Sequence, residues 1–351
     1  MIPSDRTPSE ILSARARSHL KLPHFRFTIK RMMILVAVVA SSISLSNFAL
    51  MTLFSVLLDD EHFVSRRSNS FAWDAGSSPR ILVELDEGYI TVHQSVDGKV
   101  RARLDRFAVT KLSQSAADAA LEDISCSATR EDGEIRITTI RYPTIRAGQL
   151  KADIVLEVPP DASLDLLTSH GYIYIGKKWE GAMIVTAPVA LKAVKARDLG
   201  NIYHGIEARL ADRPSAPPTR LDLDSRLGAV VIEGRNLSVV ARAGNGAIDF
   251  RGSLAPGDHR FESGGHGQSF DPSGMSREGV TIRLPPDATF EVDAESAKRM
   301  VWVAFPHKVQ GGQPPRSIKA RVGAGSSTRL EVRSQDEMIE ILKADGPASS
   351  P

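Results

Sequence analysis

Gly171-Tyr-Ile-Tyr-Ile-Gly176 and Gly200-Asn-Ile-Tyr-His-Gly205 open a series of short, glycine-bounded segments in which apolar residues alternate with others. The series continues as Gly228-Ala-Val-Val-Ile-Glu-Gly234 and Gly246-Ala-Ile-Asp-Phe-Arg-Gly252, so the repeats begin 18 to 29 residues apart. Alternation is typical of strands with one buried face, and a short period is typical of stacked repeats. One such rung cannot bury its apolar residues alone, whereas a stack can. The sequence therefore predicts an all-β fold, a β-solenoid of short stacked rungs similar to a parallel β-helix.

Side-chain alternation divides each rung into an inner and an outer set. The predicted inner set is Ile173, Ile175, Ile202, Val230, Ile232, Ile248 and Phe250. Tyr172, Tyr174 and Tyr203 then face outward, and Tyr89 does so in the opening strand. Outward tyrosines either cover the sheet as a side-chain ladder or form an aromatic platform for sugar rings or a partner surface. Trp179 would extend that platform, and we take Tyr172, Tyr174, Tyr203 and Trp179 as the predicted binding face.

The 27 residues from Met32 to Leu58 carry no charge. As a helix, this segment would be long enough to span a bilayer. Lys30 and Arg31 precede this segment, and acidic residues follow it. Basic residues stay on the cytoplasmic side, so we expect a single-pass helix with the N-terminus inside. A cleavable signal peptide is the alternative.

The sequence thus predicts five parts. They are a basic cytoplasmic tail (1–31), a transmembrane helix (32–58), a juxtamembrane linker (59–78), the β-solenoid domain (79–342) and a disordered tail (343–351).

The charge distribution argues against nucleic acid as a partner. The first 31 residues hold seven Lys/Arg against two Asp/Glu, and the remainder holds 37 against 40. A slightly acidic body does not provide the basic surface that nucleic acid requires. Cys126 is the single cysteine, so no intramolecular disulfide forms, and we expect it to be a small core residue in a strand.

Two local signals predict structure outside the repeats. The alanine-rich segment 113–123 begins with serines that can cap a helix. Asp132-Gly133 is a typical hairpin turn.

Residues 212–219 and 252–279 interrupt the repeats, and we expect both to be surface loops. The second contains His259 and His266 together with several acids. A flexible glycine-rich loop does not hold metal ligands in convergent positions, so we predict no metal site and no cofactor.

The glycine-bounded rungs, the corners Val158-Pro-Pro-Asp-Ala and Leu284-Pro-Pro-Asp-Ala, and the closing Ile339-Glu-Ile341 resemble the bacterial putative-adhesin family of unknown function, the DUF4097 type. The resemblance spans residues 79–342. It implies a β-solenoid associated with the bacterial cell envelope, and the family label implies adhesion. Glu337 departs from the pattern because the other copies have glycine at that position.

We therefore expect a membrane-anchored, non-catalytic adhesion, binding or scaffold module without catalytic residues. It would lie on the bacterial cytoplasmic membrane, with its C-terminal domain in the periplasm or outside the cell, and would bind an envelope polysaccharide or protein. A polysaccharide-active solenoid enzyme is an alternative, and it would need Asp222, Asp224, Asp249 and Arg251 to converge. An envelope-stress regulatory protein, signalling through its membrane helix and basic tail, is another.

The charge step across residues 32–58 generates a topology prediction. Reporter fusions made after Asp60 should be active only outside the cytoplasm, and the mature chain should keep its first residues. N-terminal sequencing checks the second point, and a mature terminus near Ser41 would contradict the anchor.

Overall fold

The computed structural model describes residues 62–344 except 75, 77, 143–148, 181–182, 201–204, 214–216, 265–268, 271–275, 278 and 307–314. For residues 177–180, 183–186, 269–270 and 276–277 it describes the backbone alone. The described part is almost entirely β-structure, so the predicted all-β class is confirmed. Twenty-one strands form one hydrogen-bonded sheet. This sheet runs as two ladders, here called ladder A and ladder B, that share strand β15 (Ala229–Ala243).

The strands of ladder A stand side by side in an order that differs from their order in the chain. That order is β5 (Ile124–Glu131), β6 (Glu134–Arg141), β2 (Arg80–Glu87), β8 (Ala162–His170), β12 (Leu191–Asp198), β14 (Thr219–Ser225), the second half of β15, β17 (Gly257–Ser263), β24 (Thr328–Ser334), β21 (Phe290–Ser296) and β23 (Ser317–Val322).

Ladder B is built in the same way. Its order is β1 (Phe63–Trp73), β4 (Val100–Thr110), β7 (Gln149–Val158), β3 (Ile90–Gln94), β9 (Ile173–Ile175), β13 (Gly205–Arg209), the first half of β15, β16 (Ile248–Leu254), β20 (Val280–Leu284), β25 (Ile339–Lys343) and β22 (Val301–Val303). Pairing is parallel except among β1, β4 and β7, between β5 and β6, and between β21 and β23.

Three short elements complete the described part. They are helix α2 (Gln114–Leu121), the hairpin of β10 (Lys177–Glu180) and β11 (Met183–Thr186), and the hairpin of β18 (Ser269–Phe270) and β19 (Ser276–Arg277).

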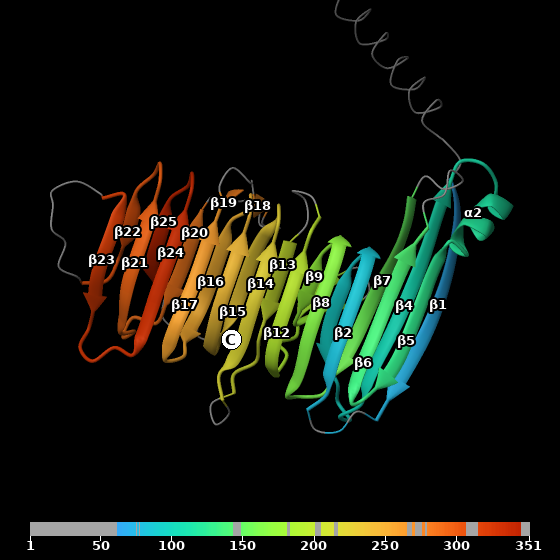
Figure 1. The fold of residues 1–351 in the computed structure, drawn as a ribbon, viewed down its shortest axis with the longest axis horizontal. Helices are drawn as coiled ribbons and strands as arrows, with labels where there is room; N and C mark the ends of the chain where they lie inside the picture. The colour runs from blue at the N-terminus through green and yellow to red at the C-terminus, as the bar shows by residue number, and fades with distance from the viewer. Residues whose placement is uncertain are drawn as a thin grey trace, which may run out of the picture. The chain divides into compact units, whose positions relative to one another are not determined.

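Most of the chain alternates between the ladders, so that a strand of ladder A is followed by one of ladder B. We call such a pair a layer; examples are β8 with β9, and β12 with β13. Neighbouring layers stack with their strands side by side (Figure 1). The last layer in the chain, β24 with β25, does not lie at the end of the stack. It pairs instead between the strands β17 and β20 on one side and β21 and β22 on the other.

The core lies between the two ladders, where the alternating inner side chains meet. Phe250 of β16 contacts Phe261 of β17 from the opposite ladder, with ring centroids 5.6 Å apart and the rings edge to face. Such a pair contributes about 0.5–1.5 kcal/mol beyond the area it buries. Apart from Ile202, which lies outside the described residues, the predicted inner set is confirmed, because all its other members are buried.

Local signals that rest on turn and cap chemistry are also confirmed. Ser113 caps α2, where its Oγ accepts a hydrogen bond from the backbone N–H of Ala116. Asp132 and Gly133 both have positive φ angles and join β5 to β6. Strands β7 and β20 end just before their Pro-Pro pairs, because proline cannot donate to a ladder.

Two expectations differ from the structure. Residues 63–73, part of the expected linker, form strand β1, which pairs with β4 along its whole length, and the compact unit begins at His62. The expected surface loop 252–279 contains strand β17, where Phe261 is fully buried. Cys126 lies in strand β5 as expected and is half-buried against the core.

The predicted cytoplasmic tail, residues 1–31, and the predicted transmembrane helix, residues 32–58, lie outside the described residues. Of the predicted disordered tail, residues 343–351, Lys343 is the last residue of strand β25, and residues 345–351 lie outside the described residues. Within the described ranges, no helix has the length and hydropathy needed to cross a bilayer.

The corners from ladder A to ladder B leave little space between layers. A Cβ atom added to Gly171 would lie 1.7 Å from the carbonyl oxygen of Gly88 in the adjacent layer. The strand ladders set the spacing of the layers at about 4.8 Å, so the backbones cannot separate locally to admit a side chain.

Buried polar residues stand side by side just before these corners. This corner column consists of Thr168, Asp198, Ser225, Ser263, Ser334 and Ser296, with Ala243 in the middle. The side chains hold the backbone of the turn: Ser225 Oγ accepts from the N–H of Gly228, and Ser334 Oγ accepts from the N–H of Glu337. Glu337 therefore takes the place of a glycine within an otherwise regular corner.

Gly171→Ala should destabilise the fold by at least ~2 kcal/mol, because the new methyl group overlaps a backbone carbonyl that has no room to move. Gly98→Ala is the control: Gly98 has a φ of +74° but no atom within 4 Å of an added Cβ. Its expected cost is about 1 kcal/mol from backbone strain alone. Urea unfolding measures both, and equal losses would contradict close packing at the corner.

Asp198 generates a prediction for the pH dependence of stability. Burial raises the pKa of Asp198 to about 6, although hydrogen bonds from Gly200 N–H and Ser225 Oγ and the nearby His170 act in the opposite direction. The folded state therefore binds a proton more tightly than the unfolded state. Stability should fall as pH rises from about 4 to about 6, by an amount on the order of 2 kcal/mol.

Asp198→Asn should remove that fall and make the protein more stable than the wild type at pH 7. Thermal unfolding between pH 4 and pH 8 checks this. Asp287→Asn, at an exposed position, is the matched control and should keep the pH dependence of the wild type. An unchanged pH profile in the Asp198→Asn variant would show that Asp198 is not the group responsible.

Candidate functional site

Three tyrosines lie together on the outer surface of ladder B. Tyr172 and Tyr174 flank one residue of β9, and their rings stack with centroids 5.1 Å apart and planes 9° apart. Tyr89 precedes β3 and approaches both, with centroid distances of 6.1 Å and 6.4 Å. The tyrosine cluster, as we call these three residues, is thus made by two neighbouring strands that are distant in sequence.

A cation and a carboxylate support the cluster from strand β7. Lys151 Nζ lies 5.0 Å from the ring centre of Tyr89 and 3.3 Å from Asp153 Oδ2. Asp153 Oδ1 accepts a hydrogen bond from the backbone N–H of Tyr89. These contacts hold Tyr89 in position, and Lys151 is attracted to the negative face of the ring.

The cluster is partly accessible. Tyr89 is 38% exposed, and Tyr172 and Tyr174 are half-buried. Burial raises the pKa of the Tyr172 and Tyr174 hydroxyls, and the neighbouring Tyr89 and Glu207 add to this shift. Tyr172 and Tyr174 are therefore neutral at physiological pH. The cluster offers flat apolar faces and hydroxyl groups, a combination suited to stacking and hydrogen bonding.

The structure brings together two residues of the predicted binding face and adds a third. Tyr172 and Tyr174 face outward as predicted, and Tyr89 completes their cluster. Tyr203 lies outside the described residues, and of Trp179 only the backbone in β10 is described. The outward position of Tyr89 follows from alternation, whereas its proximity to β9 requires the strand pairing.

Within the described residues, no group of three or more His, Cys, Asp or Glu side chains is placed to hold a metal ion. His259, expected in a loop, is buried in β17. Its Nδ1 accepts from the N–H of Val239 at 3.2 Å, and its Nε2 lies 2.8 Å from the carbonyl oxygen of Ala255. These contacts place the proton on Nε2, and burial lowers the pKa of His259. Both ring nitrogens of His259 therefore have backbone partners, and the residue links β17 to β15.

The four residues that an enzyme would need do not converge. Asp222 and Asp224 lie on β14 in ladder A, whereas Asp249 and Arg251 lie on β16 in ladder B. Asp249 is paired with Arg283 at 2.6 Å, and Asp222 lies 3.4 Å from Arg242. The structure does not bring together the four residues that the enzyme alternative would use, because β14 and β16 lie in opposite ladders.

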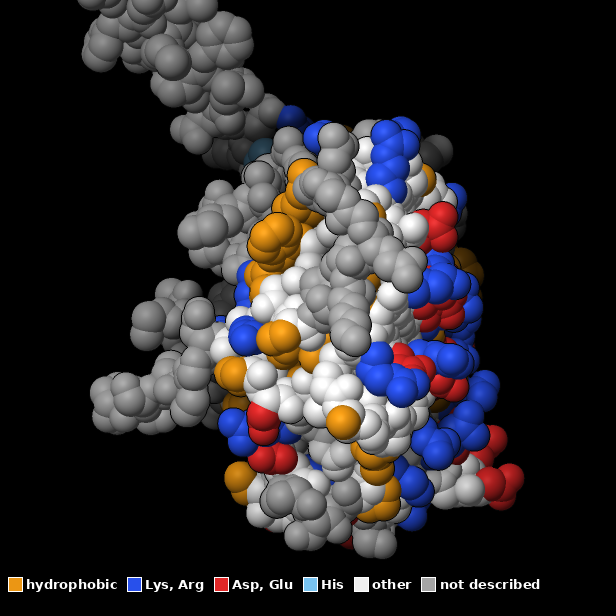
Figure 2. All heavy atoms as spheres, turned by 90° about the vertical axis from the view of Figure 1, so that its left-hand side faces the viewer, with side chains coloured by type: hydrophobic (Ala, Val, Ile, Leu, Met, Phe, Trp, Pro, Cys, Tyr) orange, Lys and Arg blue, Asp and Glu red, His pale blue; other side chains and the backbone are white. Residues whose placement is uncertain are grey.

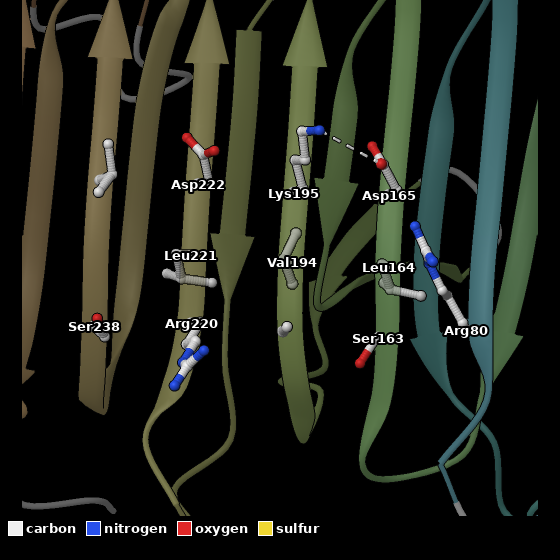
Figure 3. A pocket seen from close by; sticks show the side chains of 12 residues that line it. Arg80, Ser163, Leu164, Asp165, Val194, Lys195, Arg220, Leu221, Asp222 and Ser238 are labelled. Carbon is white, nitrogen blue, oxygen red and sulfur yellow. Dashed lines mark ion pairs between the residues drawn. The ribbon is translucent and has the colours of Figure 1, made fainter.

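A hollow of about 450 Å³ lies on the outer face of ladder A, across β2, β8, β12, β14 and β15 (Figure 3). Small side chains form its floor, including Ser163, Ala193 and Ser238. Arg80 and Arg220 lie at the same level along the strands, and Lys195 pairs with Asp165 at 3.7 Å above them. No sequence motif indicates this hollow, because its residues come from segments that share no common pattern.

The two sides of the domain differ in chemistry. Seen from the β22–β23 end, Lys, Arg, Asp and Glu side chains are dense on one side, whereas the other side shows hydrophobic side chains among fewer charged ones (Figure 2). The charged side is the outer face of ladder A, where ion pairs such as Arg333 with Asp293 at 3.0 Å cross between strands. The tyrosine cluster belongs to ladder B.

No model of a known protein family matches the chain. No curated protein matches it either. The DUF4097 resemblance therefore stays a prediction.

Several solved structures match the chain at low identity and low TM-score. A putative adhesin from Bacteroides fragilis has 12% identity and a TM-score of 0.39, with 80% of this chain and 97% of that chain covered. A putative cell adhesion protein from Clostridium sporogenes has 9% identity and a TM-score of 0.33, covering 80% and 100%. A putative lipid binding protein from Parabacteroides distasonis has 10% identity and a TM-score of 0.31, covering 78% and 96%. At these TM-scores the likeness neither assigns a family nor identifies a ligand.

Proposed function

We propose that this protein is a non-catalytic binding module of the bacterial cell envelope, and that the tyrosine cluster is its binding face. The observation that carries the proposal is the grouping of Tyr89, Tyr172 and Tyr174 on the outer surface of ladder B. Aromatic residues in the core of a domain need no ligand to explain them, whereas grouped aromatics at the surface are typical of interaction sites.

The chemistry of the cluster favours a sugar or a sugar-like partner surface. The rings present apolar area next to polar hydroxyls, and Lys151 and Asp153 fix Tyr89 before any ligand arrives. A pre-positioned aromatic loses little side-chain entropy on binding, so more of its contact energy appears as affinity. An envelope polysaccharide is the partner we favour, and a protein surface is the second.

The location is part of the proposal. The charge-free segment 32–58, with basic residues before it and acidic residues after it, supports a single-pass anchor with the N-terminus in the cytoplasm. The domain would then lie in the periplasm or outside the cell. We further propose that its layers are the rungs of a flattened β-solenoid with ladders A and B as its two faces. The in-register parallel pairing of successive layers supports this architecture.

Binding experiments with the full-length protein test the function. Chitooligosaccharide, peptidoglycan and a neutral glucan serve as probes. A Tyr89→Ala, Tyr174→Ala double variant should lose at least ~tenfold in affinity for the probe that the wild type binds, because stacked aromatics are frequent hot spots. The variant Tyr174→Phe keeps the ring and should keep most of the affinity. Isothermal titration calorimetry measures the affinities, and thermal unfolding shows whether each variant is folded.

Tyr142→Ala is the matched control, because Tyr142 is 55% exposed and is not part of the cluster. It should bind like the wild type. Normal binding by the double variant would refute the tyrosine cluster as the binding face. The enzyme alternative makes a different prediction. If the wild type degrades a polysaccharide and the Asp249→Asn, Arg251→Gln double variant does not, the protein is an enzyme and the binding-module proposal is wrong.

A further inference from the structure

One row of the hollow on ladder A carries cations and hydroxyls but no carboxylate. Arg80, Ser163, Ala193, Arg220 and Ser238 lie side by side on five neighbouring strands. Three strand spacings separate the two arginines, which is about 14 Å at the usual spacing within a sheet. Only small side chains lie between them, so the hollow is open along this row.

The other charges of the hollow are balanced within the protein. Lys195 lies 3.7 Å from Asp165, and Asp222 lies 3.4 Å from Arg242. Arg80 pairs at the edge of the hollow with Glu134 at 3.1 Å and is largely exposed.

Arg220 differs from these residues. It is exposed, has no ion pair within the described part of the chain, and points away from Asp222 (Figure 3). Other arginines on the same outer face, such as Arg242 and Arg333, lie against carboxylates. The hollow therefore has one guanidinium group whose charge no carboxylate of the described residues balances.

We propose that this hollow binds an acidic polysaccharide, with Arg220 and Arg80 holding successive oxyanion groups of the sugar chain. A guanidinium group presents a planar fork of N–H donors that matches a carboxylate or sulfate group. Ser163 and Ser238 supply hydroxyls between and beside the arginines for the sugar hydroxyls. Lys192, an exposed extra residue in β12 at a bulge, precedes Ala193 in the chain.

The lining distinguishes a polysaccharide from other anionic partners. A hollow of about 450 Å³ is larger than a single inorganic anion and falls in the range of ligand sites. Its apolar residues Leu164, Val194 and Leu221 are buried beneath the floor, so that Ala193 and the half-buried Val240 are the apolar side chains at its surface, which is too little for an anchor. Peptide interfaces depend on buried apolar or aromatic anchors, and membrane-binding surfaces on apolar side chains that insert. A hydroxyl-rich, charged chain needs neither.

This site lies on the opposite ladder from the tyrosine cluster, so it is independent of the proposed function there. Calorimetry with the full-length protein tests the proposed site on ladder A. The probes are polygalacturonate, dextran sulfate and uncharged dextran, each titrated in low and in physiological salt. The wild type should bind at least one acidic polymer and not dextran, more weakly at higher salt. Comparing the affinities for polygalacturonate and dextran sulfate shows whether the site prefers carboxylate or sulfate groups.

Arg220→Gln should weaken that binding about tenfold, the usual effect of losing one charge-assisted contact. Arg251→Gln is the matched control, since it removes the same charge from an exposed position on ladder B. It should leave binding nearly unchanged. Equal losses in the two variants would overturn the site, because they would show that only net charge matters.

A second pair of variants acts on the floor of the hollow without touching an arginine. Ala193→Glu places a carboxylate between Arg80 and Arg220 and should abolish binding, whereas Ala193→Gln adds nearly the same volume without charge and should weaken it less. Equal binding of dextran and the acidic polymers would overturn the proposal. So would the absence of binding to both acidic polymers, or binding only to vesicles of anionic phospholipid.

Discussion

The spacing between layers is the constraint on which the rest of this structure depends. Parallel ladders place neighbouring backbones about 4.8 Å apart, and each strand obtains its hydrogen bonds from the layers on both sides. At the corners this distance leaves no room for a Cβ atom, as the approach of Gly171 to the Gly88 carbonyl shows. The backbone N–H groups of each turn must then find hydrogen-bond acceptors nearby, and the Ser, Thr and Asp side chains of the corner column supply them. Asp198 fills that role at the expense of burying a carboxyl group.

The same stacking creates the outer surfaces. Because strands pair in register, residues at equivalent positions of different layers become neighbours, even when they lie more than 80 residues apart in the chain. Tyr89 reaches Tyr172 in this way on ladder B, and Arg80 and Arg220 share a row on ladder A. A face assembled from such rows suits extended partners, since it offers repeated contacts along the stack. The tyrosine cluster on ladder B and the hollow with Arg220 on ladder A are therefore two separate surfaces on one scaffold.

The sequence alone predicted what depends on local chemistry. Alternation identified the inner residues from Ile173 to Phe250, because a side chain's face within a strand depends only on its neighbours. Capping by Ser113, the Asp132-Gly133 turn and the strand ends before the Pro-Pro pairs follow from backbone preferences that any context retains. The sequence-based predictions were wrong where they relied on amino-acid composition and not on the alternation of residues. The segment 252–279 is rich in glycine, but Phe261 and His259 alternate with exposed residues and form a buried strand.

Only the tertiary structure decided which layers are neighbours. Nothing in the last repeat, Thr328 to Lys343, shows that it inserts between β17 and β21 and does not end the stack. Pairing depends on the fit of whole layers across large sequence separations, and each layer has similar strands to offer. For the same reason the hollow around Arg220 could not be predicted: its residues come from five strands joined by pairing alone. The sequence by itself determined the inner face of each strand and most of the turns, and the packing of distant layers determined the surfaces.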